Sequence, residues 1–63
     1  MRAMIENLIN GNISTARKQA KRFRLPDIEA ALREEYGWSE TKALRAAVFL
    51  KTGEQFQAYC DAV

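Results

Sequence analysis

The sequence predicts an all-α protein: a compact orthogonal bundle of four or five short helices in a single domain over residues 1–63. No segment alternates between apolar and polar residues over four or more positions, as a half-buried strand would. Apolar residues instead recur at helical spacings of three and four, in segments separated by turn-forming residues. Because 48% of the residues are apolar, the chain has enough apolar side chains for a thin core.

Two helices are expected before Pro26. The first ends at Asn10-Gly11-Asn12, which favours left-handed and turn conformations. Its apolar residues are Met1, Met4, Ile5, Leu8 and Ile9. Asn12 or Ser14 caps the second helix. The residues expected to face inward from this second helix are Ile13, Ala16, Ala20 and Phe23.

A third and a fourth helix follow. Pro26 suits the first helical position, which places Leu25 in an extended conformation, and Gly37 suits the left-handed end. The expected apolar stripe of the third helix is Ile28, Ala31, Leu32 and Tyr36. Ser39 is the expected N-cap of the fourth helix, which Gly53 ends. The expected buried face of the fourth helix is Ala43, Leu44, Ala47 and Val48.

The last helix is expected to begin with a capping box formed by Thr52 and Gln55. Its apolar residues are Phe56, Tyr59, Cys60 and Val63. A thiol on such a face is more often a small core residue than a nucleophile, so Cys60 is expected in the core.

The charge of the chain is divided unevenly. Residues 1–26 carry six basic and one acidic side chains, a balance of +5, whereas residues 27–63 have a balance of −3. Five of the basic residues form a cluster without an intervening acid: Arg17, Lys18, Lys21, Arg22 and Arg24. At about 100° per residue most of them share one flank of the second helix, which predicts a basic face that contacts a partner. The alternative is a solvated face balanced by carboxylates of the later helices.

A helix-turn-helix is the specific form of a nucleic-acid-binding alternative, with Gly37-Trp38-Ser39 as its turn. Leu32 and Trp38 are apolar where that motif requires it, but Arg33 stands where a small buried residue is normal. The would-be recognition helix carries the cations Lys42, Arg45 and Lys51. The same turn, followed by an Ala-rich helix, also resembles ubiquitin-associated domains.

Trp38 and Phe49 are the aromatic residues considered for an interface. A tryptophan beside a turn in so short a chain is more often part of the core than a partner anchor. Phe49 lies off the expected apolar stripe of its helix, so an exposed Phe49 would mark an interface.

Several classes of function are disfavoured by composition. The chain has no histidine, and the adjacent carboxylates of Glu34 and Glu35 point about 100° apart, so catalysis, a metal site and a cofactor are not expected. The single Cys60 rules out an intramolecular disulfide, which fits a reducing cytoplasm. No run of about 18 apolar residues is present, and Glu6 and Asn7 interrupt any signal-peptide core, so neither a membrane partner nor export is expected.

Several segments together resemble small helical proteins encoded by tailed bacteriophages and prophages. These segments are Gly11-Asn12-Ile13, Ala16 to Phe23, Tyr36 to Ser39, Leu50 to Gly53 and Phe56 to Ala62. Such families have no assigned catalytic motif. The resemblance implies a bacterial cytoplasm and a protein that binds a host protein or a component of a defence system.

The sequence therefore predicts a non-enzymatic interaction protein that binds an acidic surface of a host protein through its basic face. The alternatives are a nucleic-acid-binding module and a homodimeric structural protein, whose melting temperature would depend on concentration.

Overall fold

Helices are the regular elements of residues 1–62, the part of the chain that the computed structural model describes, and no strand occurs among them. The helices are α1 (Arg2–Ile9), α2 (Ile13–Ala20), α3 (Leu25–Tyr36), α4 (Glu40–Thr52) and α5 (Phe56–Asp61). The predicted all-α bundle is confirmed, with five helices within this range.

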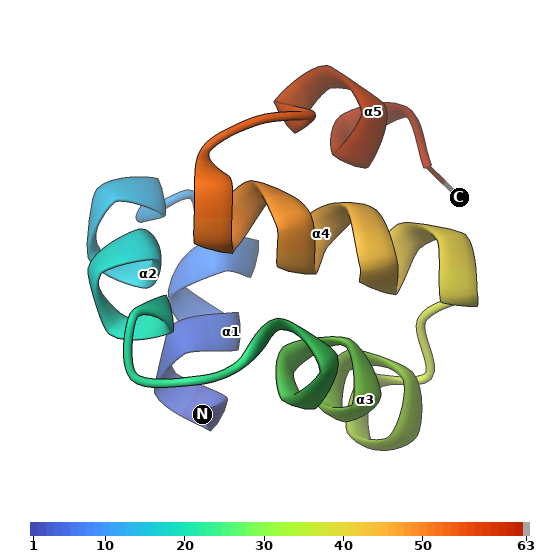
Figure 1. Cartoon of the computed structure of the whole chain (residues 1–63), viewed down its shortest axis with the longest axis horizontal. Helices are drawn as coiled ribbons and strands as arrows, with labels where there is room; N and C mark the ends of the chain where they lie inside the picture. Colours follow the sequence, from blue (N-terminus) through green and yellow to red (C-terminus); the bar gives the residue numbers. More distant parts are fainter. Residues whose placement is uncertain (63) are drawn as a thin grey trace.

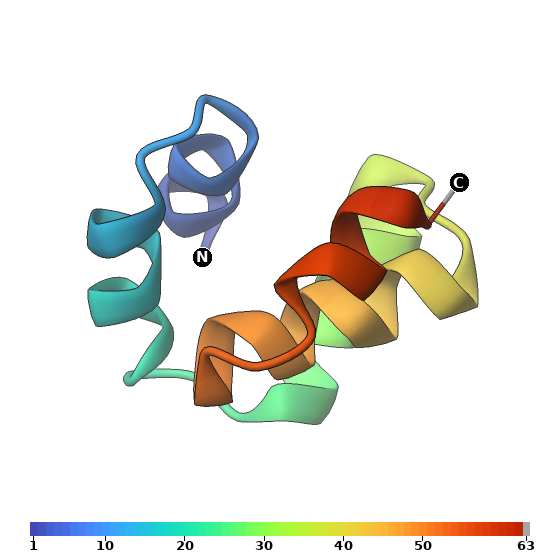
Figure 2. The same ribbon diagram turned by 90° about the horizontal axis from the view of Figure 1, so that it is seen from above.

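Helix α4 is the central element of the bundle (Figure 1). Helices α2, α3 and α5 all contact α4, and α1 packs mainly on α2. Seen from above, α1 and α2 lie on one side, while α3 and α5 lie along α4 on the other (Figure 2). The C-terminal part of α4 reaches α2 and joins the two parts.

The core draws on α1 to α4, and α4 contributes the largest share. Its buried residues are Met4, Ile5, Leu8, Ala16, Ala20, Ile28, Leu32, Ala43, Ala46, Ala47, Phe49 and Leu50. Five of these twelve residues are alanines, and small side chains at a contact let helix axes approach more closely. A short chain thereby encloses a core with helices of only 6 to 13 residues.

Three predicted helix ends are confirmed. The Ser39 hydroxyl accepts a hydrogen bond from the Lys42 backbone N–H at 3.2 Å, as an N-cap does. Gly37 and Gly53 follow α3 and α4 in the left-handed conformation, with φ of 69° and 79°. A residue with a Cβ adopts this conformation only at a cost, which explains glycine at both positions.

Two other predicted boundaries are wrong. Helix α3 begins at Leu25, and the extended residue before it is Arg24, so Pro26 occupies the second helical position. The Thr52–Gln55 capping box does not form, because Thr52 belongs to α4 and its hydroxyl donates to the Val48 carbonyl at 2.8 Å. Gln55 adopts a positive φ of 66° and is the N-cap of α5 without a side-chain bond.

The expected burial is wrong for four apolar residues. Leu44 is 43% exposed, Ile9 is 52% exposed, Phe56 is 46% exposed and Cys60 is exposed. The reason for Leu44 is that α4 packs against three neighbours through a face centred on Ala43, Ala46, Ala47, Phe49 and Leu50, which turns Leu44 to solvent. Cys60 is exposed because no residue of the short helix α5 is fully buried. Val63, which was expected in the same stripe, lies outside the described residues.

Candidate interaction surface

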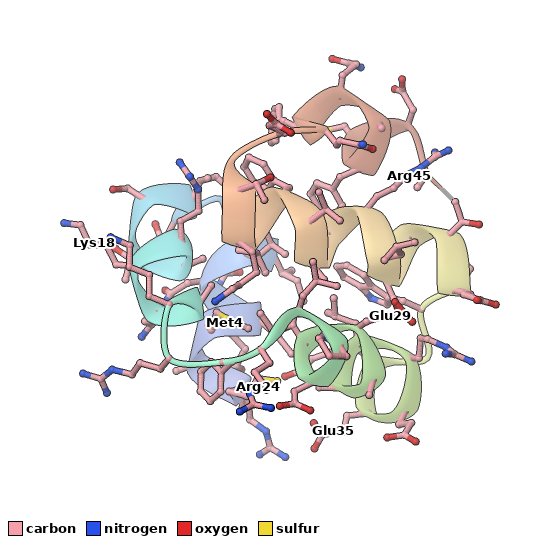
Figure 3. All side chains as sticks on the ribbon, viewed as in Figure 1. Met4, Lys18, Arg24, Glu29, Glu35 and Arg45 are labelled. Atoms are coloured by element: carbon pink, nitrogen blue, oxygen red, sulfur yellow. The ribbon has the colours of Figure 1, made fainter. Side chains whose placement is uncertain are left out.

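Helix α2 presents the predicted basic face. Ala16 and Ala20 are buried, and a rotation of about 100° per residue then directs Arg17, Lys18 and Lys21 outward. All five residues of the predicted cluster are exposed. Figure 3 shows Lys18 projecting away from α2 and from the rest of the molecule.

The basic cluster is not neutralised by the chain's own carboxylates. Within residues 1–62 the one ion pair joins Arg33 and Glu29 on α3, at 3.5 Å. Glu29 and Glu35 lie on α3, well away from Lys18 (Figure 3). In the described part of the chain the cluster therefore keeps its charge available, contrary to the alternative of a face balanced by later helices.

The helices α2 and α4 enclose an open groove of about 230 Å³ beside the basic face. Its lining residues are Ser14, Arg17, Lys18, Lys21, Leu50 and Lys51. Three of the five predicted cations therefore line this groove. A fourth cation, Lys51, lines it as well, although the sequence pattern places Lys51 on the would-be recognition helix.

Lys51 reaches from α4 to the end of α2. Its Nζ donates to the Ala20 carbonyl at 3.1 Å and to the Phe23 carbonyl at 2.6 Å. A cation at a helix C-terminus interacts favourably with the negative end of the helix dipole, so Lys51 stabilises this helix end and adds positive charge to the groove. This contact joins residues about 30 positions apart, so no local sequence signal marks it.

Arg17 makes the reciprocal contact from α2 to the end of α4. Its guanidinium lies over Gly53: a Cβ at position 53 would come within 2.5 Å of Arg17 Nη2. The guanidinium is therefore placed beside the C-terminus of α4, where a cation is favoured. Glycine at 53 both ends α4 and leaves the space that this side chain occupies.

The other two predicted residues lie outside the groove. Arg22 lines a second hollow of about 190 Å³ with Phe23 and residues of α1. Arg24 lies on the segment that joins α2 to α3, where it is the N-cap of α3 (Figure 3). The predicted face is therefore a groove with two adjoining cations rather than a single patch.

The cations of α4 contact this chain instead of a free surface. Lys42 Nζ lies 4.1 Å from the centroid of the Trp38 ring, a cation–π contact. Arg45 Nη1 donates to the Ala58 carbonyl of α5 at 3.4 Å, and Lys51 is bound to the end of α2. The helix that a helix-turn-helix would insert into DNA is thus covered by neighbours on several sides.

The aromatic residues form a cluster between α4 and α5. Phe49 is only 6% exposed, so it does not meet the condition of exposure under which it would mark an interface. Its ring centroid lies 4.9 Å from that of Phe56 and 6.1 Å from that of Tyr59. Trp38 is half-buried, packs against the core and stacks on Tyr59 at 6.0 Å, in agreement with a structural role. Burial raises the pKa of the Tyr59 phenol, and the neighbouring Cys60 raises it further.

Within residues 1–62 no group of three or more potential metal ligands comes together. None of the helices in this range has the length and apolar character needed to cross a membrane.

Residues 1–62 therefore form a small bundle of five helices with a cationic groove. Comparisons with known protein families, with characterised proteins and with solved structures find no match to this chain.

Proposed function

We propose that this chain is a non-enzymatic interaction protein that binds an acidic surface of another protein through its basic face. The basic face comprises Arg17, Lys18, Lys21, Arg22 and Arg24. The observation that carries the proposal is that none of these five cations forms an ion pair within residues 1–62. Unpaired cations on one side of a molecule create a field that attracts anionic partners and accelerates their association.

A protein partner is favoured over DNA by the distribution of charge. The net charge is only +2, and α3 carries the carboxylates of Asp27, Glu29, Glu34 and Glu35. A duplex that extended beyond the basic face would meet these acids, and phosphate recognition usually accompanies a more basic domain. The cations of α4 are already engaged within the chain, which removes the main support for a helix-turn-helix.

The proposed setting is the cytoplasm of a bacterial host, with a phage or prophage as the origin of the chain. It rests on the sequence resemblance to small helical proteins encoded by phages and prophages. Such proteins bind and redirect host proteins or block defence systems. The partner is then a host protein with an acidic surface.

The test is capture of a partner from bacterial lysate with three baits. Lys18→Glu/Arg22→Glu reverses two charges of the basic face, and Arg2→Glu/Arg33→Glu makes the same change in net charge elsewhere on the exposed surface. We expect a protein that the wild type and the control capture and that Lys18→Glu/Arg22→Glu does not. Equal capture by all three baits would refute the role of the basic face.

A second measurement separates the nucleic-acid alternative. The protein is titrated against fluorescent single- and double-stranded DNA and RNA at about 50 and 200 mM salt, the range over which phosphate contacts lose most affinity. We expect no binding at the higher salt concentration. Tight binding that falls steeply between the two concentrations would favour a nucleic-acid-binding module.

A further inference from the structure

The groove between α2 and α4 differs from a patch of mobile surface cations, because hydrogen bonds within this chain hold one of its cations, Lys51, in place. Lys51 Nζ is fixed by the carbonyls of Ala20 and Phe23, at 3.1 and 2.6 Å. The guanidinium of Arg17 rests over Gly53. Donors that are positioned before a ligand arrives lose little conformational entropy when it binds.

The groove also concentrates charge of one sign. Its lining combines four cations, the hydroxyl of Ser14 and the buried Leu50, and includes no carboxylate. The two bonds of Lys51 run to neutral carbonyls, so its positive charge is not cancelled. A concave site with one sign of charge and an apolar wall focuses the field on whatever anion enters it, and it stabilises a dianion more than a monoanion.

The size of the groove suits one chemical group rather than a whole small molecule. Its volume of about 230 Å³ is below the roughly 300–1,000 Å³ of pockets that enclose whole small molecules. A phosphoryl group on a protein side chain carries about −1.5 to −2 charges and three strong acceptor oxygens. Arg17 offers a planar fork of donors for such oxygens, and the ammonium groups of Lys18 and Lys21 are free to close over them.

We infer that the α2–α4 groove binds a phosphoryl group carried by a side chain of the protein partner. The inference rests on the proposed function, because it names the group on the partner that the basic face recognises. A nucleic-acid backbone fits the surroundings less well, because the net charge is only +2 and α3 carries the carboxylates of Asp27, Glu29, Glu34 and Glu35. A single phosphoryl group needs only the cations of the groove, whereas a longer chain of phosphates would extend beyond them.

The experiment follows the backbone amide resonances of the protein while sodium phosphate is added at neutral pH and constant ionic strength, with sodium acetate as the monoanion control. We expect phosphate to shift the amides of the groove and to bind about tenfold more tightly than acetate. The amides expected to shift are those of Ser14, Arg17, Lys18, Lys21 and Lys51. Equal responses to the two anions, or shifts centred on the α1–α2 hollow, would overturn the inference.

Two variants with the same change in net charge locate the site. Lys18→Gln/Lys21→Gln removes two groove cations and should weaken phosphate binding about tenfold or more, while Arg22→Gln/Arg24→Gln should change it less than about twofold. All four side chains are exposed, so both variants should keep the fold. Equal weakening by the two variants would show a diffuse charge effect and overturn the inference.

The source of the phosphoryl group is tested with N-acetyl-phosphoserine amide and a single-stranded oligonucleotide. The phosphoserine probe should bind in the groove at least as tightly as phosphate, and its unphosphorylated form should not bind. An oligonucleotide whose affinity rises with its length would contradict a protein-borne group. None of these titrations needs the partner, so their failure would overturn the groove inference alone and leave capture from lysate as the separate test of the basic face.

Discussion

Replacing Lys51 with methionine tests whether the contact between α4 and the end of α2 stabilises the fold. Methionine keeps an unbranched apolar stem but removes the ammonium group that donates to Ala20 and Phe23 at 3.1 and 2.6 Å. Hydrogen bonds from a charged donor contribute roughly 1.5–3 kcal/mol each, but the site is partly buried and water replaces part of the loss, so we expect about 2 kcal/mol. A chain of this length has a free energy of unfolding of roughly 3–9 kcal/mol, so the loss is large.

Urea unfolding followed by far-ultraviolet circular dichroism measures this loss. With a urea dependence of about 1 kcal/mol/M, the midpoint should fall by about 2 M, and the melting temperature by roughly 8–16 °C. Lys21→Met is the matched control, because Lys21 is exposed and lies on the same groove, and it should change stability by less than about 0.5 kcal/mol. Equal effects of the two substitutions would refute the view that Lys51 stabilises the end of α2.

Three further predictions follow from local geometry. Because burial raises the pKa of Tyr59, the neutral phenol contributes stability that is complete below pH 10.0 and is lost as the pH rises beyond that value. The wild type should therefore lose more stability than Tyr59→Phe between about pH 9 and 11, as measured by urea unfolding. Parallel losses in the two proteins would contradict this prediction. Gly11→Ala and Gly53→Ala should each lower the free energy of unfolding by about 1–2 kcal/mol, because both positions have a positive φ. Only Gly53→Ala must also displace Arg17, so it should cost more than Gly11→Ala. This excess cost should disappear in an Arg17→Ala background, and an excess that persists there would have another cause. Ser39→Ala should cost about 1 kcal/mol through loss of its cap on α4, measured by thermal unfolding, and an unchanged melting temperature would show that the cap adds nothing.

Local chemistry explains which parts of the fold could be predicted from the sequence. Glycines at 37 and 53 and serine at 39 act through their own backbone or through residues three positions away, so their roles are visible in the sequence. The stripes of α1 to α3 depend on a single buried face and were largely correct. The expected stripe of the central helix was not correct. Helix α4 contacts three other helices, and its buried face is wider than a one-sided stripe, which is why Phe49 is buried and Leu44 is exposed.

The candidate site could also be predicted only in part from the sequence. Exposure of the α2 cations follows from helical periodicity once Ala16 and Ala20 are taken as the buried face. The groove itself could not be predicted, because it exists only where α2 meets the end of α4. Lys51 was assigned to a possible recognition helix, and nothing near it in the sequence indicates that its ammonium group binds the carbonyls of Ala20 and Phe23.

The position of α4 in the bundle also explains which cations of the chain stay exposed and which are engaged within it. In so short a chain one helix has to contact most of the others for a core to close, and the cations on that helix then find acceptors and aromatic rings within the chain. Helix α2 packs mainly on α1 and α4, and its cations form no ion pair within residues 1–62. The same packing that withdraws Lys51 from a DNA-reading role brings it to the groove beside Arg17. The peripheral helix α2 therefore carries the surface through which we propose that the chain binds an anionic partner.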